Sequence, residues 1–354
     1  MRVALHVVAG SLGGPRTYGI ALARALACRD DLELTVLTDR PEAFPGIRSV
    51  KLPRMRPLAD HIVTPAVLQR LQPDVYHNTK NVLPFVAPCP AVVTVHDLAY
   101  HHFPETFSRA ARIYLRAHTV HAVRRASRVV TVSQHARRDL IETLKVPEHK
   151  VAVAYNGVAK SFRDALPPQP LADLRRPYVL SVGTIQARKN LDVLVDAIEL
   201  VRNRDGLDVE LAIAGRRGWR TEAFDRAVKR TPVRLLGVVA EADLPALYAH
   251  AAVFVQPSSY EGFGLTAAEA MVMGAPVVAA NAGSLPEVVG DCALLVPPRD
   301  AKALAEALLR LLEDPQQARE LGEAGRVRAQ RFTWEASAEA HVAVYRAVAH
   351  RVAV

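Results

Sequence analysis

The stretch SSYEGFGLTAAEAMVMGAPVVAA, residues 258–280, holds the features that decide the fold. Its EGFG segment has two glycines, which favour a loop, so a helix starts only after it. The residues LTAAEAMVM then predict a helix over 265–273. The next run, PVVAA, is apolar without alternation, as in a strand that is buried on both faces. A loop, a helix and a buried strand in this order predict one unit of a parallel α/β sheet.

The same alternation of strands and helices extends over the whole chain. In the first half, strands are predicted for RVALHVV, ELTVLT, VYHN, AVVTVHD, RVVTVS and KVAVAYNGV, and helices near 15–28, 61–71, 108–126 and 134–144. The proline-rich segment 162–177 interrupts the pattern. Afterwards come YVLSVGT, VELAIAG, VRLLGVV, VFVQPS and ALLVPP, with further helices at 189–203, around 220–230 and at 243–250. We therefore predict an α/β protein of two doubly wound parallel-sheet domains facing across a ligand-binding cleft.

Charge is distributed unevenly along the 354 residues. The formal net charge is +9, and residues 1–160 hold 22 of the 45 basic residues but only 12 of the 36 acidic ones. Residues 109–138 contain eight arginines and no acid. Such a field favours an anionic partner, which can be a membrane surface, a nucleic acid or an acidic substrate.

Other bulk features indicate a cytoplasmic protein. No apolar run reaches the ~18 residues of a membrane span. The N-terminal apolar run is interrupted by His6 and is better interpreted as a first strand than as a signal peptide. The three cysteines form no metal or redox motif, as expected in a reducing compartment.

Two glycine-marked turns are candidates for binding phosphate. GSLGGPRTYG (10–19) follows the first strand, and its Gly13 and Gly14 allow either a close approach of backbone N–H groups to a phosphate or simply a tight turn. SVGTIQARKNLD (181–192) places Arg188 and Lys189 at a predicted helix start. Cations there oppose the helix dipole, so we expect an anion to join them.

The two acids of the opening stretch are predicted to bind different parts of one ligand. Glu261 belongs to the loop and Glu269 to the helix, and an ionised carboxylate only accepts hydrogen bonds. Two carboxylates so separated suit two hydroxyl groups of an extended ligand, with a phosphate held between them by the N–H groups at the helix start. Glu269 also lies in an apolar stretch, where an acid requires a partner.

Taken together, these residues resemble retaining glycosyltransferases of the GT-B fold, family 4 (glycosyl transferases group 1), in a mannosyltransferase-like branch. The resemblance rests on YEGFGLTAAEAMVMGAPVVAA and on PDVYHNTKNVLP (73–84), TVHDLAYHHFPE (94–105), VTVSQHARRDL (130–140), VGTIQARKN (182–190) and SLPEVVGDCALLV (284–296). It implies an acceptor-binding domain over 1–165, a donor-binding domain over 166–334, and a closing helix over 335–354 that returns to the first domain.

The resemblance also implies roles for individual residues. Glu269 would bind the donor ribose, and Glu261 with the backbone of Gly262, Phe263, Gly264 and Leu265 would hold the donor sugar. Arg188 and Lys189 would neutralise the diphosphate, Gly13 and Gly14 would face it from the other domain, and His96 would lie near the donor sugar and the acceptor. Many relatives carry an arginine directly after the strand glycine, where this chain has Thr184.

The expected reaction is transfer of a hexose with retention of configuration. The departing diphosphate needs positive charge, which Arg188, Lys189 and the helix-start N–H groups supply. No Asp-x-Asp motif occurs, so we expect no metal and no cofactor besides the nucleotide-sugar donor. GDP-mannose is the first candidate donor, with UDP- and dTDP-sugars as alternatives.

The acceptor and the class of protein leave alternatives open. The acceptor is expected to be a glycan, a lipid-linked molecule or a small molecule. The arginine-rich segment 109–138 either contacts an anionic membrane peripherally or is a solvated face. A GT-B sugar-nucleotide epimerase and a non-catalytic nucleotide- or anion-binding protein are the alternative functions. No nucleic-acid partner is expected, because recognition motifs and aromatic platforms are missing.

Overall fold

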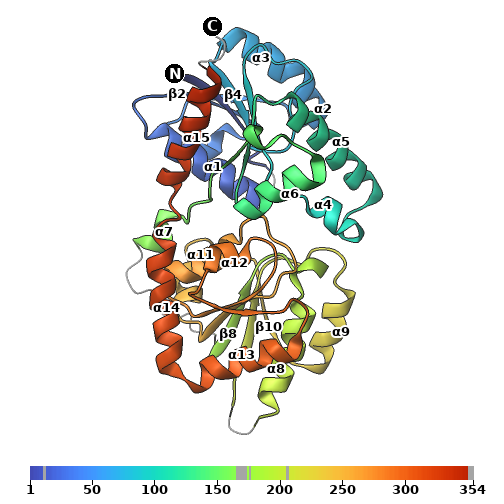
Figure 1. Ribbon diagram of the computed structural model, residues 1–354, viewed down its shortest axis with the longest axis vertical. Coiled ribbons are helices and arrows are strands. Elements are labelled where there is room, and N and C mark those ends of the chain that lie inside the picture. The colour runs from blue at the N-terminus through green and yellow to red at the C-terminus, as the bar shows by residue number, and fades with distance from the viewer. Residues whose placement is uncertain (11–12, 165–173, 175–176, 205–206, 350–354) are drawn as a thin grey trace. The chain divides into compact units, whose positions relative to one another are not determined.

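The computed structural model of the protein describes residues 1–10, 13–164, 174, 177–204 and 207–349. Internal contacts divide it into two compact units (Figure 1). Unit 1 comprises Met1–Gly157 and the C-terminal segment from Thr333, and unit 2 comprises Val158–Phe332. The predicted boundary between residues 165 and 166 lies outside the described residues, whereas the contacts change from one unit to the other after Gly157.

Unit 1 is built on a seven-stranded parallel sheet with strand order β3-β2-β1-β4-β5-β6-β7. Its strands are β1 (Arg2–Val7), β2 (Glu33–Thr38), β3 (Ser49–Lys51), β4 (Val75–Asn78), β5 (Ala91–Thr94), β6 (Arg128–Thr131) and β7 (Val151–Val153). Its helices include α1 (Gly14–Ala27), α2 (Arg56–Leu58), α3 (Thr64–Leu71), α4 (Ala99–His102), α5 (Arg109–Arg125) and α6 (Gln134–Leu144). The strand order reverses between β1 and β4, as in a doubly wound sheet.

Unit 2 repeats this plan with six parallel strands in the order β10-β9-β8-β11-β12-β13. The strands are β8 (Tyr178–Val182), β9 (Glu210–Ala214), β10 (Arg234–Gly237), β11 (Val253–Gln256), β12 (Val277–Ala280) and β13 (Leu294–Val296). The helices are α7 (Lys160–Arg163), α8 (Leu191–Arg202), α9 (Glu222–Arg230), α10 (Leu244–Ala249), α11 (Leu265–Val272), α12 (Leu285–Val289), α13 (Ala301–Glu313) and α14 (Pro315–Ala329). The two parallel sheets confirm the predicted fold class. The order reverses between β8 and β11, where such sheets bind ligands at the carboxyl ends of the strands.

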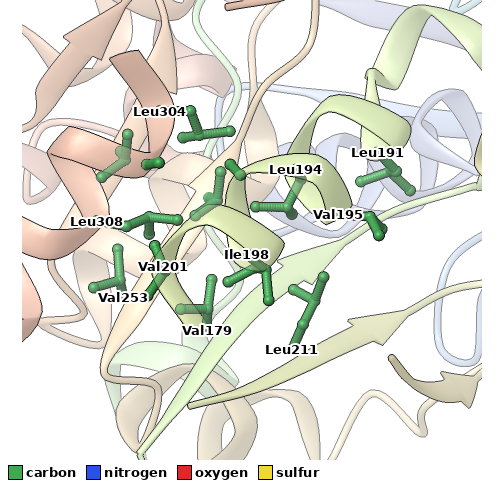
Figure 2. Close-up of a cluster of buried hydrophobic side chains, with 14 of the residues drawn as sticks. Val179, Leu191, Leu194, Val195, Ile198, Val201, Leu211, Val253, Leu304 and Leu308 are labelled. Atoms are coloured by element: carbon green, nitrogen blue, oxygen red, sulfur yellow. The ribbon is translucent and has the colours of Figure 1, made fainter. Parts of the chain in front are cut away.

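The core of unit 2 fixes the position of these strand ends. Leu194, Ile198 and Val201 of α8 are spaced so that one helix face packs onto the sheet, as Figure 2 shows. Leu304 and Leu308 of α13 close the cluster from the side. Burying each such side chain contributes about 1.5–3 kcal/mol. This packing anchors α8 against β8, and therefore also the turn that joins them.

The last helix, α15 (Trp334–Ala349), belongs to unit 1. The hydroxyl of Tyr18 in α1 is 2.8 Å from Nε2 of His341, and the ring of Tyr18 contacts that of Trp334 edge-on at 5.8 Å. The helix therefore packs against α1 through buried aromatic and polar side chains. Of the predicted helix 335–354, residues 350–354 lie outside the described residues.

Candidate functional site

Glu261 and Glu269 lie on either side of the start of α11. Glu261 is in the loop that follows β11, and Glu269 is in α11. Gly264 ends this loop with φ of 98°. A Cβ atom there would lie 2.7 Å from Cδ2 of Leu285. The positive φ and the lack of room for a side chain therefore both require glycine at this position. The helix begins at Leu265, and its first N–H groups have no partner within the helix.

The turn after β8 corrects one premise of the sequence analysis. Arg188 and Lys189 lie in a 3₁₀ turn, Ala187–Lys189, and α8 begins only at Leu191. Asn190 separates the two elements with a left-handed φ of 48°. The helix therefore starts two residues later than the predicted residue 189, and both cations lie directly before its start instead of inside it.

This turn is bonded to the Glu261 loop instead. Nδ2 of Asn190 donates to the carbonyl oxygen of Pro257 at 2.8 Å and to Oγ of Ser259 at 2.7 Å. The N–H of Ser259 donates to the carbonyl oxygen of Arg188 at 2.9 Å. The loops that follow β8 and β11 are thus joined at the point where the strand order reverses.

A cluster of charges forms where the two loops meet. Nζ of Lys189 is 2.5 Å from Oε1 of Glu261, and Nη1 of Arg188 is 3.2 Å from Oε2. Nε2 of Gln256 donates to Oε1 at 3.1 Å. The exposed fractions of the charged side chains are only 15% for Arg188, 15% for Lys189 and 11% for Glu261. The anion that the sequence led us to expect beside the two cations is thus, in this structure, the carboxylate of Glu261.

Electrostatics make Glu261 a permanent anion at neutral pH. Burial raises the pKa of its carboxyl group, but Lys189 and Arg188 outweigh burial and lower the pKa to about 2. Because two cations face one anion, an excess of one positive charge remains in the cluster. The site can therefore still attract an anionic ligand.

Glu269 has a different environment. Its Oε2 accepts a hydrogen bond from the hydroxyl of Tyr248 in α10 at 2.8 Å. Although part of its surface remains exposed, burial raises the pKa of Glu269 to about 7; the hydrogen bond from Tyr248 opposes this rise, and the charge of Glu241 adds to it. Glu269 can therefore change its protonation state near neutral pH.

The backbone between the two acids is packed into unit 2. Gly262, Phe263 and Gly264 are buried, and Leu265 is half-buried. The ring of Phe263 contacts that of Phe332 edge-on at 5.2 Å. The residues expected to hold the donor sugar thus lie on a well-anchored loop.

In unit 1, His96 follows β5 and is held by two contacts. Its Nε2 is 3.0 Å from the carbonyl oxygen of Thr79, and its ring lies edge-on to Tyr18 at 4.6 Å. A carbonyl only accepts, so Nε2 carries the proton and Nδ1 is left as an acceptor. Burial lowers the pKa of His96, and the Thr79 carbonyl partly opposes this shift, so the ring is neutral at pH 7.

Gly13 and Gly14 form the start of α1. Gly13 has φ of 89°, and no described atom lies within 4 Å of a Cβ built at either glycine. In the first turn of α1, the N–H of Arg16 donates to the carbonyl oxygen of Gly13 at 3.0 Å. The predicted tight turn between strand and helix includes residues 11–12, which lie outside the described residues. Binding of phosphate at this turn stays a prediction.

The structure brings together some of the expected residues and adds others. Arg188, Lys189 and Glu261 form one cluster, Glu269 is paired separately with Tyr248, and Gly13, Gly14 and His96 belong to unit 1. Sequence reasoning missed Gln256 and Tyr248. The glutamine that ends the apolar strand VFVQ was a signal, since a polar side chain there faces the ligand-binding edge.

Two further observations concern metals and membranes. In the described part of the chain, no group of three or more His, Cys, Asp or Glu side chains is arranged to hold a metal ion. The helices within the same ranges include none that is both long and apolar enough to span a bilayer.

Comparison with known proteins identifies the family. Residues 176–314 match the family model for Glycosyl transferases group 1, and residues 12–162 match that for Glycosyltransferase Family 4. O-antigen chain mannosyltransferase B of Escherichia coli is 34% identical over 256 residues, which cover 69% of this chain and 67% of that protein. The MMP alpha-(1->4)-mannosyltransferase of Mycolicibacterium hassiacum is also 34% identical, over 65% of this chain and 56% of the relative.

Solved structures share the fold over nearly the whole chain. Sucrose-phosphate synthase from Thermosynechococcus elongatus has a TM-score of 0.76 at 25% identity and covers 98% of both chains. Anabaena HepE in complex with UDP and glucose has a TM-score of 0.77 at 22% identity, covering 97% of this chain and 99% of that one. Both are similar to this chain along its two units.

Proposed function

Because this chain belongs to glycosyltransferase family 4 and has the GT-B fold, we propose that it transfers a hexose from a nucleoside-diphosphate sugar to an acceptor hydroxyl, with retention of configuration and without a metal ion. The observation that supports this best is the cluster of Arg188, Lys189 and Glu261 at the strand-order reversal of unit 2. It offers an excess positive charge beside the free N–H groups at the start of α11.

The proposed step exchanges one bond for another at the anomeric carbon. The bond from that carbon to the diphosphate oxygen breaks, and the acceptor oxygen forms its bond on the same face of the sugar. The acceptor proton passes to the leaving phosphate oxygen. Arg188 and Lys189 stabilise the charge that develops on this oxygen, which is the task a metal ion has in other enzymes. Addition of EDTA should therefore leave the rate unchanged.

Glu261 and Glu269 act as binding groups in this proposal. Glu261 is held as an anion and accepts hydrogen bonds from sugar hydroxyls, while Glu269 accepts them from the ribose. The covalent intermediate of a retaining glycosidase is not needed. Glu261→Gln should weaken use of the donor, and mass spectrometry of the wild type during turnover should detect no sugar on Glu261. A sugar adduct at that residue would contradict the proposed mechanism.

The donor is proposed to be GDP-mannose. Support comes from the two relatives, which are named as mannosyltransferases. The test is incubation with GDP-mannose, UDP-glucose and a dTDP-hexose without acceptor. Slow release of GDP from GDP-mannose is expected, and release from another of the three sugars instead would contradict the proposed donor. A changed sugar still attached to its nucleotide would indicate an epimerase, and no reaction with any of the three would indicate a binding protein.

We further propose that the enzyme acts in the cytoplasm, contacts an anionic membrane through segment 109–138 and takes a lipid-linked acceptor. Each of the five arginines of α5 lacks a carboxylate partner among the described residues. Large apolar side chains are exposed beside them: Ile113 is 65% exposed and Tyr114 40%, and Phe85, whose ring contacts His121 of α5 at 5.1 Å, is 59% exposed. Basic and aromatic side chains together are typical of a surface that lies on lipid headgroups.

A groove beside α5 supports this contact. It has a volume of about 590 Å³, and its apolar lining includes Ile113, Val120 and Leu144. Arg116, Arg124 and Lys145 also line it. Vesicles of phosphatidylglycerol should therefore co-sediment the protein at low salt, and vesicles of phosphatidylcholine should not. Arg116→Glu together with Arg124→Glu should abolish co-sedimentation, whereas Arg230→Glu in unit 2 should not. Equal sedimentation by both lipids would contradict the proposal.

A further inference from the structure

The loop 215–221, GRRGWRT, continues the pairing of β9 with β8 beyond the sheet. The N–H of Ile185 donates to the carbonyl oxygen of Arg216 at 3.0 Å, and the N–H of Gly218 donates to the carbonyl oxygen of Ile185 at 2.9 Å. These bonds hold the loop beside the segment that leads from β8 into the turn of Arg188 and Lys189.

Glycines make this approach possible. A Cβ at Gly215 would lie 1.9 Å from the carbonyl oxygen of Gly183, and one at Gly218 would lie 2.7 Å from that of Ile185. On its other side, Gly183 borders Lys189, whose Nζ would lie 3.7 Å from a Cβ at Gly183. Gly183 is therefore a neighbour of both the start of the loop and the Lys189 ammonium group.

The loop carries charge that the fold does not use. Arg217 forms an ion pair with Asp225 of α9. The exposed guanidinium groups of Arg216 and Arg220 have neither an ion pair nor a hydrogen bond with any of the described residues. Arg220 also has a left-handed φ of 58°, which is unfavourable for a residue with a side chain. Neighbouring residues of an extended segment point to opposite sides, so Arg216 faces away from α9.

A count of charges indicates what these arginines bind. The diphosphate of a nucleotide sugar carries about two negative charges, and about three once the sugar has left. Glu261 neutralises one of the two cations in the central cluster, so the cluster offers only one excess positive charge. Thr184, which directly follows Gly183, adds none. Arg216 and Arg220 would supply the two charges that are missing.

We propose that loop 215–221 is a second donor-binding element, in which Arg216 and Arg220 bind the diphosphate and Trp219 covers the bound nucleotide. This inference rests on the proposed function, since it assigns further contacts to the same ligand. Trp219 is 48% exposed and lies between the two guanidinium groups in the sequence. An indole ring in that position can stack on a base or a sugar.

Calorimetric titration with GDP, UDP and dTDP tests the charges. For the nucleotide that binds the wild type, Arg216→Ala with Arg220→Ala should raise Kd by about 10- to 100-fold, since two charge-assisted contacts are lost. The affinity for the corresponding nucleoside monophosphate should fall much less in this variant, because the central cluster of Arg188, Lys189 and Glu261 can neutralise more of its smaller charge. Arg226→Ala with Lys229→Ala, which removes two exposed cations of α9, is the charge-matched control and should bind as the wild type does.

A second variant separates binding from folding. Arg220→Gly removes the guanidinium group and relieves the unfavourable φ, so it should raise Tm while it weakens binding of the diphosphate. Weaker binding by a more stable protein cannot result from unfolding.

Tryptophan fluorescence tests the third contact. Trp334, the other tryptophan, is buried in unit 1 and 7% exposed, so a spectral change on adding nucleotide should come from Trp219. The change should vanish in Trp219→Phe. If no nucleotide binds the wild type, the proposed donor site is wrong. If one binds and neither the double variant nor Trp219→Phe differs from the wild type, the donor site stands and the role of the loop is refuted.

Discussion

Glu261 and Glu269 are the same residue type in one loop and helix, yet their carboxyl groups have opposite properties. Lys189 and Arg188 lie 2.5 Å and 3.2 Å from the carboxylate of Glu261, and its pKa falls to about 2. Glu269 has the neutral hydroxyl of Tyr248 at 2.8 Å, and its pKa rises to about 7. Burial raises the pKa of both, so the neighbouring charges make the difference.

The contrast in pKa indicates different roles for Glu261, which is a fixed anion, and Glu269, which titrates near neutral pH. Glu261 stays ionised and, with its cations, forms a fixed pattern of charge before any ligand arrives, which is the preorganisation that catalysis of charge separation needs. Glu269 must lose a proton before it can accept hydrogen bonds with both oxygens. The charge of Glu261 is therefore insensitive to pH in the neutral range, whereas the charge of Glu269 changes with pH there.

The largest effect is expected from removing the charge that distinguishes Glu261. Lys189→Met leaves Arg188 alone with Glu261, so the cluster loses its excess positive charge and the pKa of Glu261 rises. Turnover should fall by about 100- to 1000-fold, as when a group that stabilises a developing anion is deleted. The measurement is kcat with the donor found in the sugar-nucleotide panel. Lys229→Met, on the exposed face of α9, is the control, and turnover of Lys189→Met within twofold of the wild type would contradict the proposed role.

The next effect concerns Gly264, which ends the loop of one acid and starts the helix of the other. Gly264→Ala would place a methyl group 2.7 Å from Leu285 in a backbone of φ 98°. We expect a loss of about 1–2 kcal/mol from the left-handed conformation and about 1–3 kcal/mol from the close contact. Gly237→Ala in the same unit, with φ of 64° and open space around it, should show only the first loss. Equal urea midpoints for the two variants would show that the loop relaxes without cost.

Sequence patterns predicted most of the helices and strands, because each of these elements depends on residues that are close together in the chain. The segment 134–144 was predicted as a helix and is α6 with the same bounds. The two glycines of EGFG likewise separated the loop of Glu261 from the helix of Glu269. Both features depend on residues that are close together in the chain, and periodicity and turn chemistry report on such neighbours.

The ion pair between Lys189 and Glu261 could not be predicted in the same way. It joins residues 72 positions apart, and the contact depends on β8 and β11 being neighbours in the sheet. Strand order is a tertiary property that a hydrophobic pattern leaves open. The same reason explains why Tyr248, 21 positions from Glu269, was missed. The helix start was predicted two residues early because Asn190 adopts a left-handed conformation, which asparagine tolerates but does not require.

A smaller effect is expected from pH, through Glu269. Between pH 4.5 and about 7 the folded protein keeps a proton that the unfolded chain has released, so this group lowers stability as pH rises through that window. Binding of the ribose should show the opposite trend, because only the ionised carboxylate accepts from both hydroxyls. The affinity for the nucleoside diphosphate should therefore rise by up to about tenfold from pH 6 to pH 8.

Glu269→Gln isolates this dependence. The amide does not titrate, so affinity should be weaker and almost flat between pH 6 and pH 8. Glu261→Gln should keep the slope of the wild type, because Glu261 is ionised throughout. A slope that survives in Glu269→Gln would assign the titration to another group.

The smallest effect should come from a substitution of Tyr248, which changes the environment of Glu269 and leaves both acids in place. Its hydroxyl donates to Glu269 and lowers the pKa of that carboxyl group against the effect of burial. Tyr248→Phe should therefore move the midpoint of the pH dependence of nucleotide binding upward by about one pH unit, which corresponds to about 1.4 kcal/mol. Tyr178→Phe is the matched control, because that buried hydroxyl donates to the carbonyl oxygen of Leu247 at 2.7 Å and not to Glu269. It should lower stability and leave the midpoint in place. If Tyr248→Phe leaves the midpoint unchanged as well, the hydroxyl does not tune Glu269, and burial together with the charge of Glu241 sets the pKa of that carboxyl group.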